Sequence, residues 1–98
     1  NTFSDQFRLI NNFPNPFNPS TTINFEVLDF VAKDAIVKIY NIQGQLQKTI
    51  SQNIGNNGHY SVFWNGKTDT GVGLPSGEYI YTIEYNNIIK TGKMCLVK

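Results

Sequence analysis

Few side chains in this sequence could do chemistry, and oxygen ligands for a cation are the first candidates. Asp69-Thr70-Gly71, together with Asn65 and Asp34 elsewhere in the chain, offers the carboxylate and amide oxygens that Ca²⁺ prefers. Their spacing does not match the loop of an EF-hand, and Asp69 before Gly71 is typical of a turn in which the carboxylate bonds its own backbone. We therefore expect Asp69 to shape a turn, and we expect neither a metal site nor a cofactor.

Nucleophilic and acid-base catalysis also lack their usual partners in the sequence. His59 is the single histidine, with no serine or cysteine in a recognisable nucleophile motif and no carboxylate beside it in the local sequence. The lone Cys95 cannot form an intrachain disulfide, and between Met94 and Leu96 it is predicted to be a small buried apolar residue. The other carboxylates fall at predicted turns or strand edges and are expected to face solvent: Glu26, Asp29, Asp34 and Glu84. These observations predict a protein that is not an enzyme.

Length and charge narrow the classes of function further. The 98 residues suffice for one domain with one core, and the formal net charge of +1 comes from scattered ions. We therefore expect no basic surface for nucleic acid and no polybasic membrane patch. No apolar run approaches the roughly 20 residues needed to span a bilayer, so no membrane insertion is expected. Since the chain starts at Asn1 with neither an initiator Met nor a signal peptide, we expect it to be part of a longer precursor.

The elements that would position these residues are strands. Apolar and polar residues alternate with a period of two, in short runs rich in β-branched and aromatic residues, and no helical period persists. We predict an all-β antiparallel sandwich of seven strands, at residues 7–10, 22–28, 35–42, 46–50, 59–65, 78–85 and 89–97. The alternation directs one set of side chains inward: Ile23, Phe25, Val27, Ala35, Val37, Ile39, Tyr60, Val62, Trp64, Tyr79, Tyr81, Ile83, Met94 and Leu96.

Turn residues separate the predicted strands. Gly44 in Ile42-Gln43-Gly44-Gln45 predicts a tight hairpin, because glycine adopts a positive φ without steric cost. Asn86-Asn87 predicts a two-residue hairpin, because asparagine is the residue other than glycine that best tolerates the left-handed region. The last two strands should therefore pair.

The run from Asn12 to Ile23 alternates prolines with small polar residues, so it can form neither a helix nor an inner strand. Each proline pushes the residue before it into an extended conformation. We expect a rigid lead-in to the next strand, with Phe13 and Phe17 lying on a neighbouring surface. A proline-rich linker is the alternative, but the run leads straight into the strand pattern that starts near Thr22.

The aromatic residues allow two interpretations. Trp64 and four tyrosines could form a platform that stacks against sugars, as in many β-sandwich binding modules: Tyr60, Tyr79, Tyr81 and Tyr85. The alternation turns Trp64, Tyr60 and Tyr79 inward, which favours a role in the core. Phe63, on the opposite face of its strand, is the better candidate for a surface contact.

Five ordered blocks carry a resemblance that covers most of the chain. They are Phe7-Arg8-Leu9 with the proline run of residues 12–23, Val37-Lys38-Ile39-Tyr40-Asn41-Ile42-Gln43-Gly44-Gln45, Gly58-His59-Tyr60-Ser61-Val62-Phe63-Trp64-Asn65-Gly66, Ser76-Gly77-Glu78-Tyr79-Ile80-Tyr81 and Lys93-Met94-Cys95-Leu96-Val97-Lys98. In these blocks the sequence resembles the type A C-terminal sorting domain of the bacterial type IX secretion system. It departs from the family pattern at Asn65, where Asp is usual, at Tyr60, near a common His position, and at Cys95, which interrupts the aliphatic last strand.

The resemblance implies a function that composition cannot supply. Domains of this type are immunoglobulin-like sandwiches at the carboxyl end of secreted cargo, where the outer-membrane type IX translocon recognises them. In relatives, a sortase-like cysteine peptidase on the cell surface removes the domain after export and can join the cargo to lipopolysaccharide. Residues 1–6 would then be a linker from the upstream cargo and residues 7–98 the sorting domain. We expect a monomer that is read in the periplasm and then reaches the cell surface or the medium.

Carried onto this sequence, the resemblance implies three recognition elements. They are the loop of Pro14, Asn15 and Pro16, the hairpin at Gly44, and the last strand with Lys93, Met94 and Lys98. The translocon would read a strand edge or the surface of the folded domain. For Gly44 and Met94 a role in folding alone is the alternative.

Two other classes of function remain open from the sequence. One is a carbohydrate-binding or spacer module of a secreted hydrolase, which would need an exposed row of aromatic residues or a cleft. The other is an immunoglobulin-like domain of the flagellar hook-capping type, which shares the region of Trp64-Asn65-Gly66 and Ser76-Gly77 but should lack the Pro-Asn-Pro lead.

Overall fold

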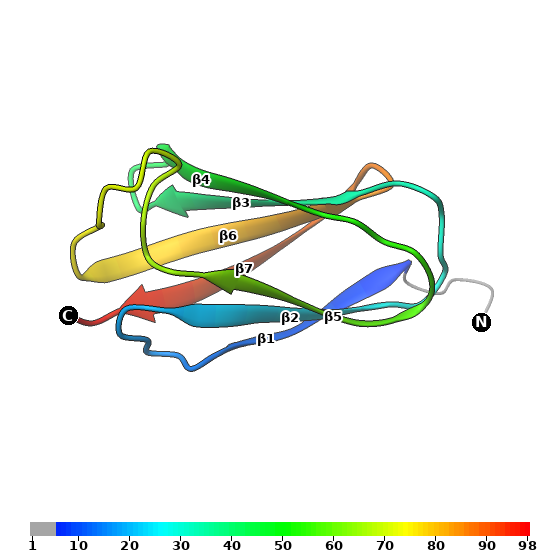
Figure 1. The fold of residues 1–98 in the computed structure, drawn as a ribbon, viewed down its shortest axis with the longest axis horizontal. Helices are drawn as coiled ribbons and strands as arrows, with labels where there is room; N and C mark the ends of the chain where they lie inside the picture. The colour runs from blue at the N-terminus through cyan, green and yellow to red at the C-terminus, as the bar shows by residue number, and fades with distance from the viewer. Residues whose placement is uncertain (1–5) are drawn as a thin grey trace.

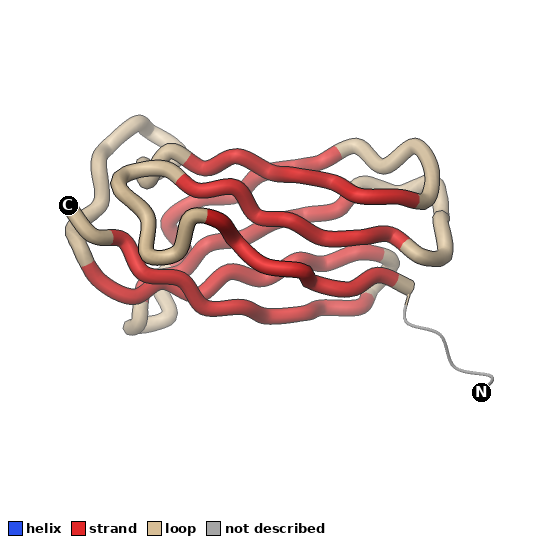
Figure 2. Tube along the Cα trace, turned by 90° about the horizontal axis from the view of Figure 1, so that it is seen from below, coloured by secondary structure: helices blue, strands red, loops and turns tan. Residues whose placement is uncertain are grey.

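Alternating apolar residues build seven strands within residues 6–98, the part of the chain that this computed structural model describes. They form two antiparallel sheets with the strand orders β1-β2-β5 and β4-β3-β6-β7, stacked face to face (Figures 1 and 2). The strands are β1 (Phe7–Phe13), β2 (Thr21–Val27), β3 (Ala35–Asn41), β4 (Leu46–Gln52), β5 (Gly58–Trp64), β6 (Gly77–Tyr85) and β7 (Ile88–Leu96). The predicted all-β antiparallel sandwich of seven strands is confirmed.

The strand boundaries agree with those predicted to within three residues, and β1 differs most. It runs to Phe13, whereas the sequence indicated an end at residue 10. A bulge between Leu9 and Asn11 interrupts the period of two, so that the alternation is lost while pairing with β2 continues. Asn12 turns inward within this extension, and its amide donates to the hydroxyl of Thr21 at 3.2 Å. A buried polar pair therefore replaces the apolar residue that the sequence pattern requires.

The inner faces of the two sheets enclose one core. All the side chains predicted to point inward are buried except Tyr60, which is half-buried and stacks on Phe25 with ring centroids 5.6 Å apart. Burial raises the pKa of the Tyr79 and Tyr81 hydroxyls, because ionisation would place a charge in an apolar region. The aromatic residues proposed as a sugar platform thus belong largely to the core, as the alternation favoured.

The two predicted hairpins are present. Gly44 has φ of 82° in the turn between β3 and β4, and Asn86 and Asn87 have φ of 52° and 66° in the turn between β6 and β7. These are left-handed conformations that glycine and asparagine adopt more readily than other residues. Both turns join antiparallel neighbours, so the last two strands pair as expected.

Three rows of side chains cross the outer face of the three-stranded sheet. Cross-strand pairing places them in the order aromatic, amide and charged: Phe13–Thr22–Phe63, Asn11–Asn24–Ser61 and Arg8–Glu26–His59. In the amide row, Asn24 donates to Asn11 at 2.8 Å and accepts from Ser61 at 2.7 Å. Opposite residues of an antiparallel pair are close enough for such contacts, and the rows tie the three strands together.

The expected linker, residues 1–6, lies outside the described residues apart from Gln6. The side chain of Gln6 donates to the carbonyl of Asp29 at 2.8 Å and accepts from Asn86 at 2.9 Å. Among the described residues, the first strand begins at Phe7, directly after these contacts.

Truncation of Trp64 tests the register of the core. Trp64 is 1% exposed, so Trp64→Ala should lower the free energy of unfolding by about 3 to 5 kcal/mol, through lost burial and an unfilled cavity. The neighbouring Phe63 is 63% exposed, and Phe63→Ala should cost no more than about 0.5 kcal/mol. Urea titrations followed by circular dichroism measure both values, and equal losses in the two variants would contradict this register.

Candidate functional site

The proline-rich loop between β1 and β2 is bound along the last strand. We call residues 14–19 the strap. The amide of Phe17 donates to the carbonyl of Cys95 at 2.9 Å, and the amide of Val97 donates to the carbonyl of Phe17 at 2.8 Å, which forms a short parallel bridge with Leu96. Strand β7 is an edge strand of the four-stranded sheet. The strap therefore occupies hydrogen-bonding groups that an edge strand otherwise leaves unpaired.

Asn15 fixes the strap to β7 through its side chain. Its Oδ1 accepts from the amide of Cys95 at 3.0 Å, and its Nδ2 lies 3.5 Å from the carbonyl of Lys93. The same Nδ2 donates to Oδ1 of Asn12 at 3.3 Å, which connects the edge contact to the buried pair with Thr21. The side chain of Asn15 thus takes the place of a backbone amide group in pairing with β7. Pro14 and Pro16 on either side cannot donate such a hydrogen bond, because proline has no backbone N–H.

Phe17 anchors the strap in the core. It is 1% exposed and packs against Trp64 with ring centroids 5.6 Å apart, and Trp64 in turn packs against Tyr79 at 5.8 Å. The expectation that Phe13 and Phe17 share a surface is therefore wrong for Phe13, which is 70% exposed on the outer face of the other sheet. The proline bends that separate the two rings send them to opposite sides of the three-stranded sheet.

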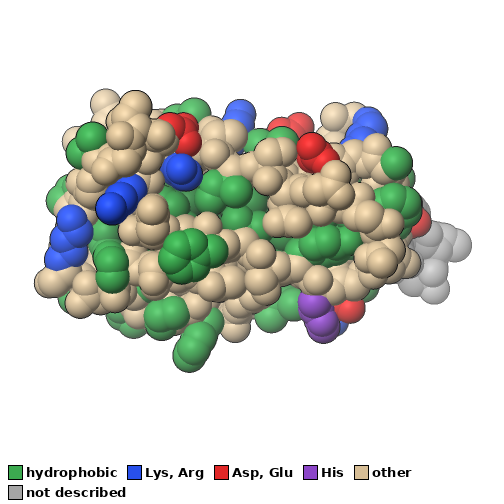
Figure 3. Space-filling view, in the orientation of Figure 1, with side chains coloured by type: hydrophobic (Ala, Val, Ile, Leu, Met, Phe, Trp, Pro, Cys, Tyr) green, Lys and Arg blue, Asp and Glu red, His purple; other side chains and the backbone are tan. Residues whose placement is uncertain are grey.

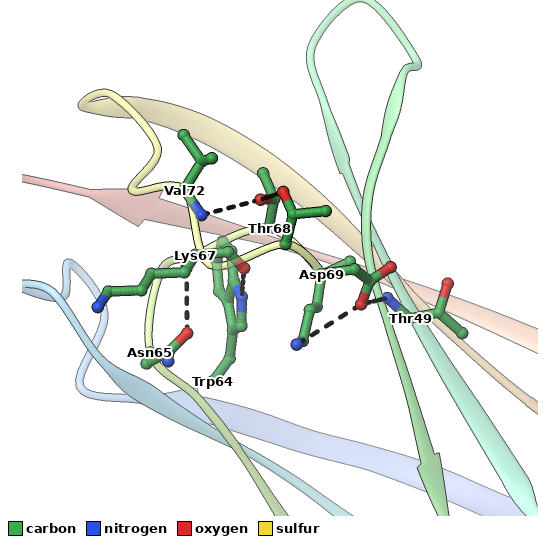
Figure 4. A network of polar contacts seen from close by, with 9 residues as sticks. Thr49, Trp64, Asn65, Lys67, Thr68, Asp69 and Val72 are labelled. Carbon is green, nitrogen blue, oxygen red and sulfur yellow. Dashed lines mark hydrogen bonds and ion pairs between the residues drawn. The ribbon is translucent and has the colours of Figure 1, made fainter.

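The strap also contacts the loop between β5 and β6. Trp64 donates its indole N–H to the carbonyl of Lys67 at 2.9 Å, which holds the start of this loop (Figure 4). Gly66 has φ of 78°, and a Cβ at this position would lie 2.6 Å from the carbonyl oxygen of Pro19. Only glycine satisfies both the backbone conformation and this close approach.

The loops 14–20, 42–45 and 65–76 and the C-terminal residues 97 and 98 gather at one end of the sandwich, on the left in Figure 1. We call this end the terminal pole. Here the Gly44 hairpin is closed by Asn41, whose Oδ1 accepts from the amides of Gln43 and Gln45 at 2.9 and 3.0 Å. The terminal amide of Lys98 donates to Oγ of Ser76 at 2.9 Å, so the C-terminus is held against the β5–β6 loop.

Two shallow hollows connect the three predicted recognition elements across the pole. One, of about 220 Å³, lies between the Gly44 hairpin and the start of β6, and is lined by Ile42, Gln43 and Ser76 among others. The other, of about 160 Å³, lies between the strap and β7, and is lined by Asn15 and Lys93. Glu78 lines both hollows. Glu78 belongs to one of the sequence blocks that carry the family resemblance, but the sequence analysis did not assign it to the recognition site.

The predicted site residues differ in their access to solvent. The exposed ones are Pro14, Asn15, Pro16, Gly44, Lys93 and Lys98. Met94 is 2% exposed and points into the core, so its side chain contributes to packing. Ile42, at 71% exposure, is an accessible apolar residue at this pole that the sequence analysis did not single out. Its position at the start of the hairpin turn, two residues before Gly44, is the signal that could have indicated it.

The turn that the sequence assigned to Asp69 is formed by Thr68. The hydroxyl of Thr68 accepts from the amide of Val72 at 3.1 Å, whereas Asp69 reaches across to β4 (Figure 4). There Asp69 Oδ1 accepts from the amide of Thr49 at 3.4 Å and lies 3.5 Å from Lys48 Nζ. The prediction that Asp69 bonds its own turn is therefore wrong, because an edge-strand amide and a lysine compete for its carboxylate.

Asn65 and Asp34 have separate local partners. Asn65 accepts from the amide of Lys67 at 3.1 Å, and Asp34 accepts from Ser51 and Asn53, each at 3.4 Å. Within residues 6–98 no three His, Cys, Asp or Glu side chains gather as metal ligands would. The oxygens that the sequence could offer to Ca²⁺ are thus dispersed over different turns.

His59 and Cys95 also occupy settings that the local sequence did not reveal. Strand pairing brings His59 Nε2 to 3.9 Å from Glu26, which binds Arg8 at 2.6 Å through the same oxygen. Exposed ion pairs of this kind contribute about 0 to 1 kcal/mol to folding stability. His59, Glu26 and Arg8 together form the charged row on the outer face of the three-stranded sheet. Cys95 is half-buried under the strap on the outer side of β7, so its expected place in the core is wrong.

Comparison with known sequences identifies one family. The FlgD Ig-like domain family matches residues 11–88 of the chain. No curated protein matches the sequence.

Solved structures share this fold at low sequence identity. PorU from Porphyromonas gingivalis, described as dimeric and latent, matches with a TM-score of 0.71 and 22% identity, over 93% of this chain and 9% of its own. PorZ from the same organism, described as an essential bacterial surface component of the type IX secretion system, matches with a TM-score of 0.63 and 20% identity, over 92% of this chain and 11% of its own. Truncated FlgD from Helicobacter pylori matches with a TM-score of 0.58 and 21% identity, over 93% of this chain and 65% of its own. At these identities the likeness establishes the fold.

Replacement of Asn15 tests how the strap is held. Asn15→Ala removes the acceptor of the Cys95 amide, so unfolding should become easier by about 1 to 2 kcal/mol. Hydrogen exchange measured by NMR should accelerate most at the amides of Cys95 and Val97, and by a smaller factor, set by the loss of global stability, in the centre of β3. Asn18→Ala, in the same loop, is the matched control. Unaltered exchange at Cys95 in the Asn15 variant would refute the role of this side chain.

Proposed function

The chain belongs to the FlgD Ig-like domain family, and from this premise we propose that it is a C-terminal sorting domain, an address that the type IX translocon reads on an exported protein. Its partners would be the translocon, the cargo fused ahead of it, and a sortase-like peptidase that removes the domain after export. The domain would act in the periplasm first and at the cell surface or in the medium afterwards. In this role it binds and performs no catalysis.

The proposal rests on one observation: hydrogen bonds hold the strap against the last strand, β7. The resemblance assigned recognition to Pro14, Asn15 and Pro16 and, separately, to the last strand, which are nearly eighty residues apart. The hydrogen bonds of Asn15 and Phe17 make them one surface. Glu78 and Ser76 extend that surface to the Gly44 hairpin. A translocon that reads a folded domain needs such a composite surface, because short segments alone occur in many proteins.

The covered edge of β7 indicates how this surface would be read. Strand addition at residues 93–97 would have to displace the strap, since Phe17 and Asn15 already occupy the backbone groups there. Recognition through side chains and exposed loops avoids that cost. Several basic side chains lie toward the pole on the face that Figure 3 shows. Lys93 in the last strand and Lys98 at the end of the chain are both exposed. An acidic surface on the translocon side would complement them.

The similar proteins support the proposal without extending it. Two of them, PorZ and PorU, contain this fold as about a tenth of their length, and PorZ is a component of the type IX secretion system. A domain of this size within much longer chains is what an appended module requires. The described residues include no helix that could cross a bilayer.

Substitution of two lysines separates recognition from folding. In a host with a working type IX system, residues 1–98 fused behind a periplasmic reporter should send the reporter to the surface or the medium. Lys93→Ala with Lys98→Ala should reduce export several-fold and shift the melting temperature by little, because exposed charges contribute no more than about 0.5 kcal/mol. Cell fractionation with immunoblotting measures export, and calorimetry of the purified domain measures folding.

Lys33→Ala with Lys38→Ala is the matched control, since neither lysine belongs to the strap, the Gly44 hairpin or the last strand and the net charge changes equally. A folded wild-type fusion that stays in the periplasm would refute the sorting function. If the variant with Lys93 and Lys98 replaced is still exported, these two lysines are not the recognition residues. The sorting function would then stand, and recognition would depend on other residues of the pole.

A further inference from the structure

The sandwich has four edge strands, and the chain protects three of them by different means. Strap residues cover β7 through hydrogen bonds to residues 95–97. Asp69 accepts the outward amide of Thr49 on β4 and binds Lys48 beside it. A bulge bends β1, and Pro14 ends it. Coverage, charge, bulges and prolines are the known devices against pairing with another chain.

The fourth edge, β5, has none of these devices. Its seven residues, Gly58–Trp64, include no lysine and no proline, and they pair with β2 in continuous register from Thr21 to Val27. Within residues 6–98, no hydrogen bond from a neighbouring segment reaches the backbone of this strand on its free side. A hollow of about 350 Å³ runs beside it toward β4, lined by Ile50, Phe63 and Trp64 among others. An open edge of this length is a template for strand pairing.

We propose that β5 pairs with β5 of a second copy of this chain, antiparallel and related by a two-fold axis at Ser61. This register pairs all seven residues, because Gly58 then lies opposite Trp64 and every intermediate residue has a partner. On the outer face His59 lies opposite Phe63, and Ser61 lies opposite its own equivalent. On the inner face Tyr60 lies opposite Val62. No two like charges meet, and hydroxyl pairs and aromatic pairs are favourable across strands.

The outer face supports the same register. The aromatic row of Phe13, Thr22 and Phe63 in one copy would continue into the charged row of His59, Glu26 and Arg8 in the other. The amide row, ending in Ser61, would continue into itself. A six-stranded sheet with a self-complementary face results, which is the form that a two-fold interface requires. This proposal replaces the monomer expected from sequence, which took no account of edge protection, and it is independent of the sorting function.

Charge at the axis provides the test. In sedimentation equilibrium, the apparent mass of the wild-type protein should rise from 11.1 kDa toward twice that value as its concentration increases. Ser61→Lys places two lysines opposite each other, so the dimer should weaken about fivefold or more. Ser61→Glu should weaken it likewise. An equimolar mixture of the two variants should associate again, since opposite charges then face each other at the axis.

Asn11→Lys is the matched control. It adds the same charge to the same row and also removes a partner of Asn24, but it lies on β1, two strands from the proposed axis. Association should persist in this variant, and circular dichroism checks that all variants fold. A wild-type chain that remains monomeric at millimolar concentration overturns the proposal. So does a dimer that Ser61→Lys and Ser61→Glu leave unchanged, because it must use another surface.

Discussion

The contact between Phe17 and Trp64 is the interaction on which the arrangement of the terminal pole depends. It brings a ring from the strap against a ring from β5, and Tyr79 of β6 completes the cluster. Phe17 lies within the strap, Trp64 is the last residue of β5 before the β5–β6 loop, and Tyr79 lies near the start of β6, just after that loop. Trp64 fixes the next loop through Lys67, and Tyr79 donates to the carbonyl of Pro75 at 2.7 Å. Apolar packing therefore sets where the polar surface of the pole can lie.

Local pattern sufficed to predict most of the fold. Alternation placed Val37 and Ile83 inside correctly, and Gly44 and Asn86 marked hairpins, because each of these signals depends on neighbouring residues only. The bulge in β1 was not predictable, since Asn11 and Asn12 resemble loop residues until a strand partner is present. Tertiary pairing decided the structure there against local composition.

The candidate site could be predicted only in part, for a related reason. The exposure of Pro14, Pro16 and Lys93 agrees with a surface role, but the bonds of Asn15 to β7 join residues about eighty positions apart. No local signal reports such a contact. The same limit applies to His59, whose carboxylate partner comes from β2, and to Asp69, which bonds an edge strand rather than its own turn.

The strand directions have a mechanical consequence. Strand β7 ends at the pole, and strand β1 begins at the opposite end of the sandwich (Figure 1). Tension applied between a cargo at the front of the domain and a grip on the pole would therefore act along the strands. Antiparallel hydrogen bonds lie across that direction, so all the bonds of a strand would share the load and none would open ahead of the others. Under this shear load the domain would resist unfolding. It would therefore transmit force from the grip on its pole to the cargo without stretching.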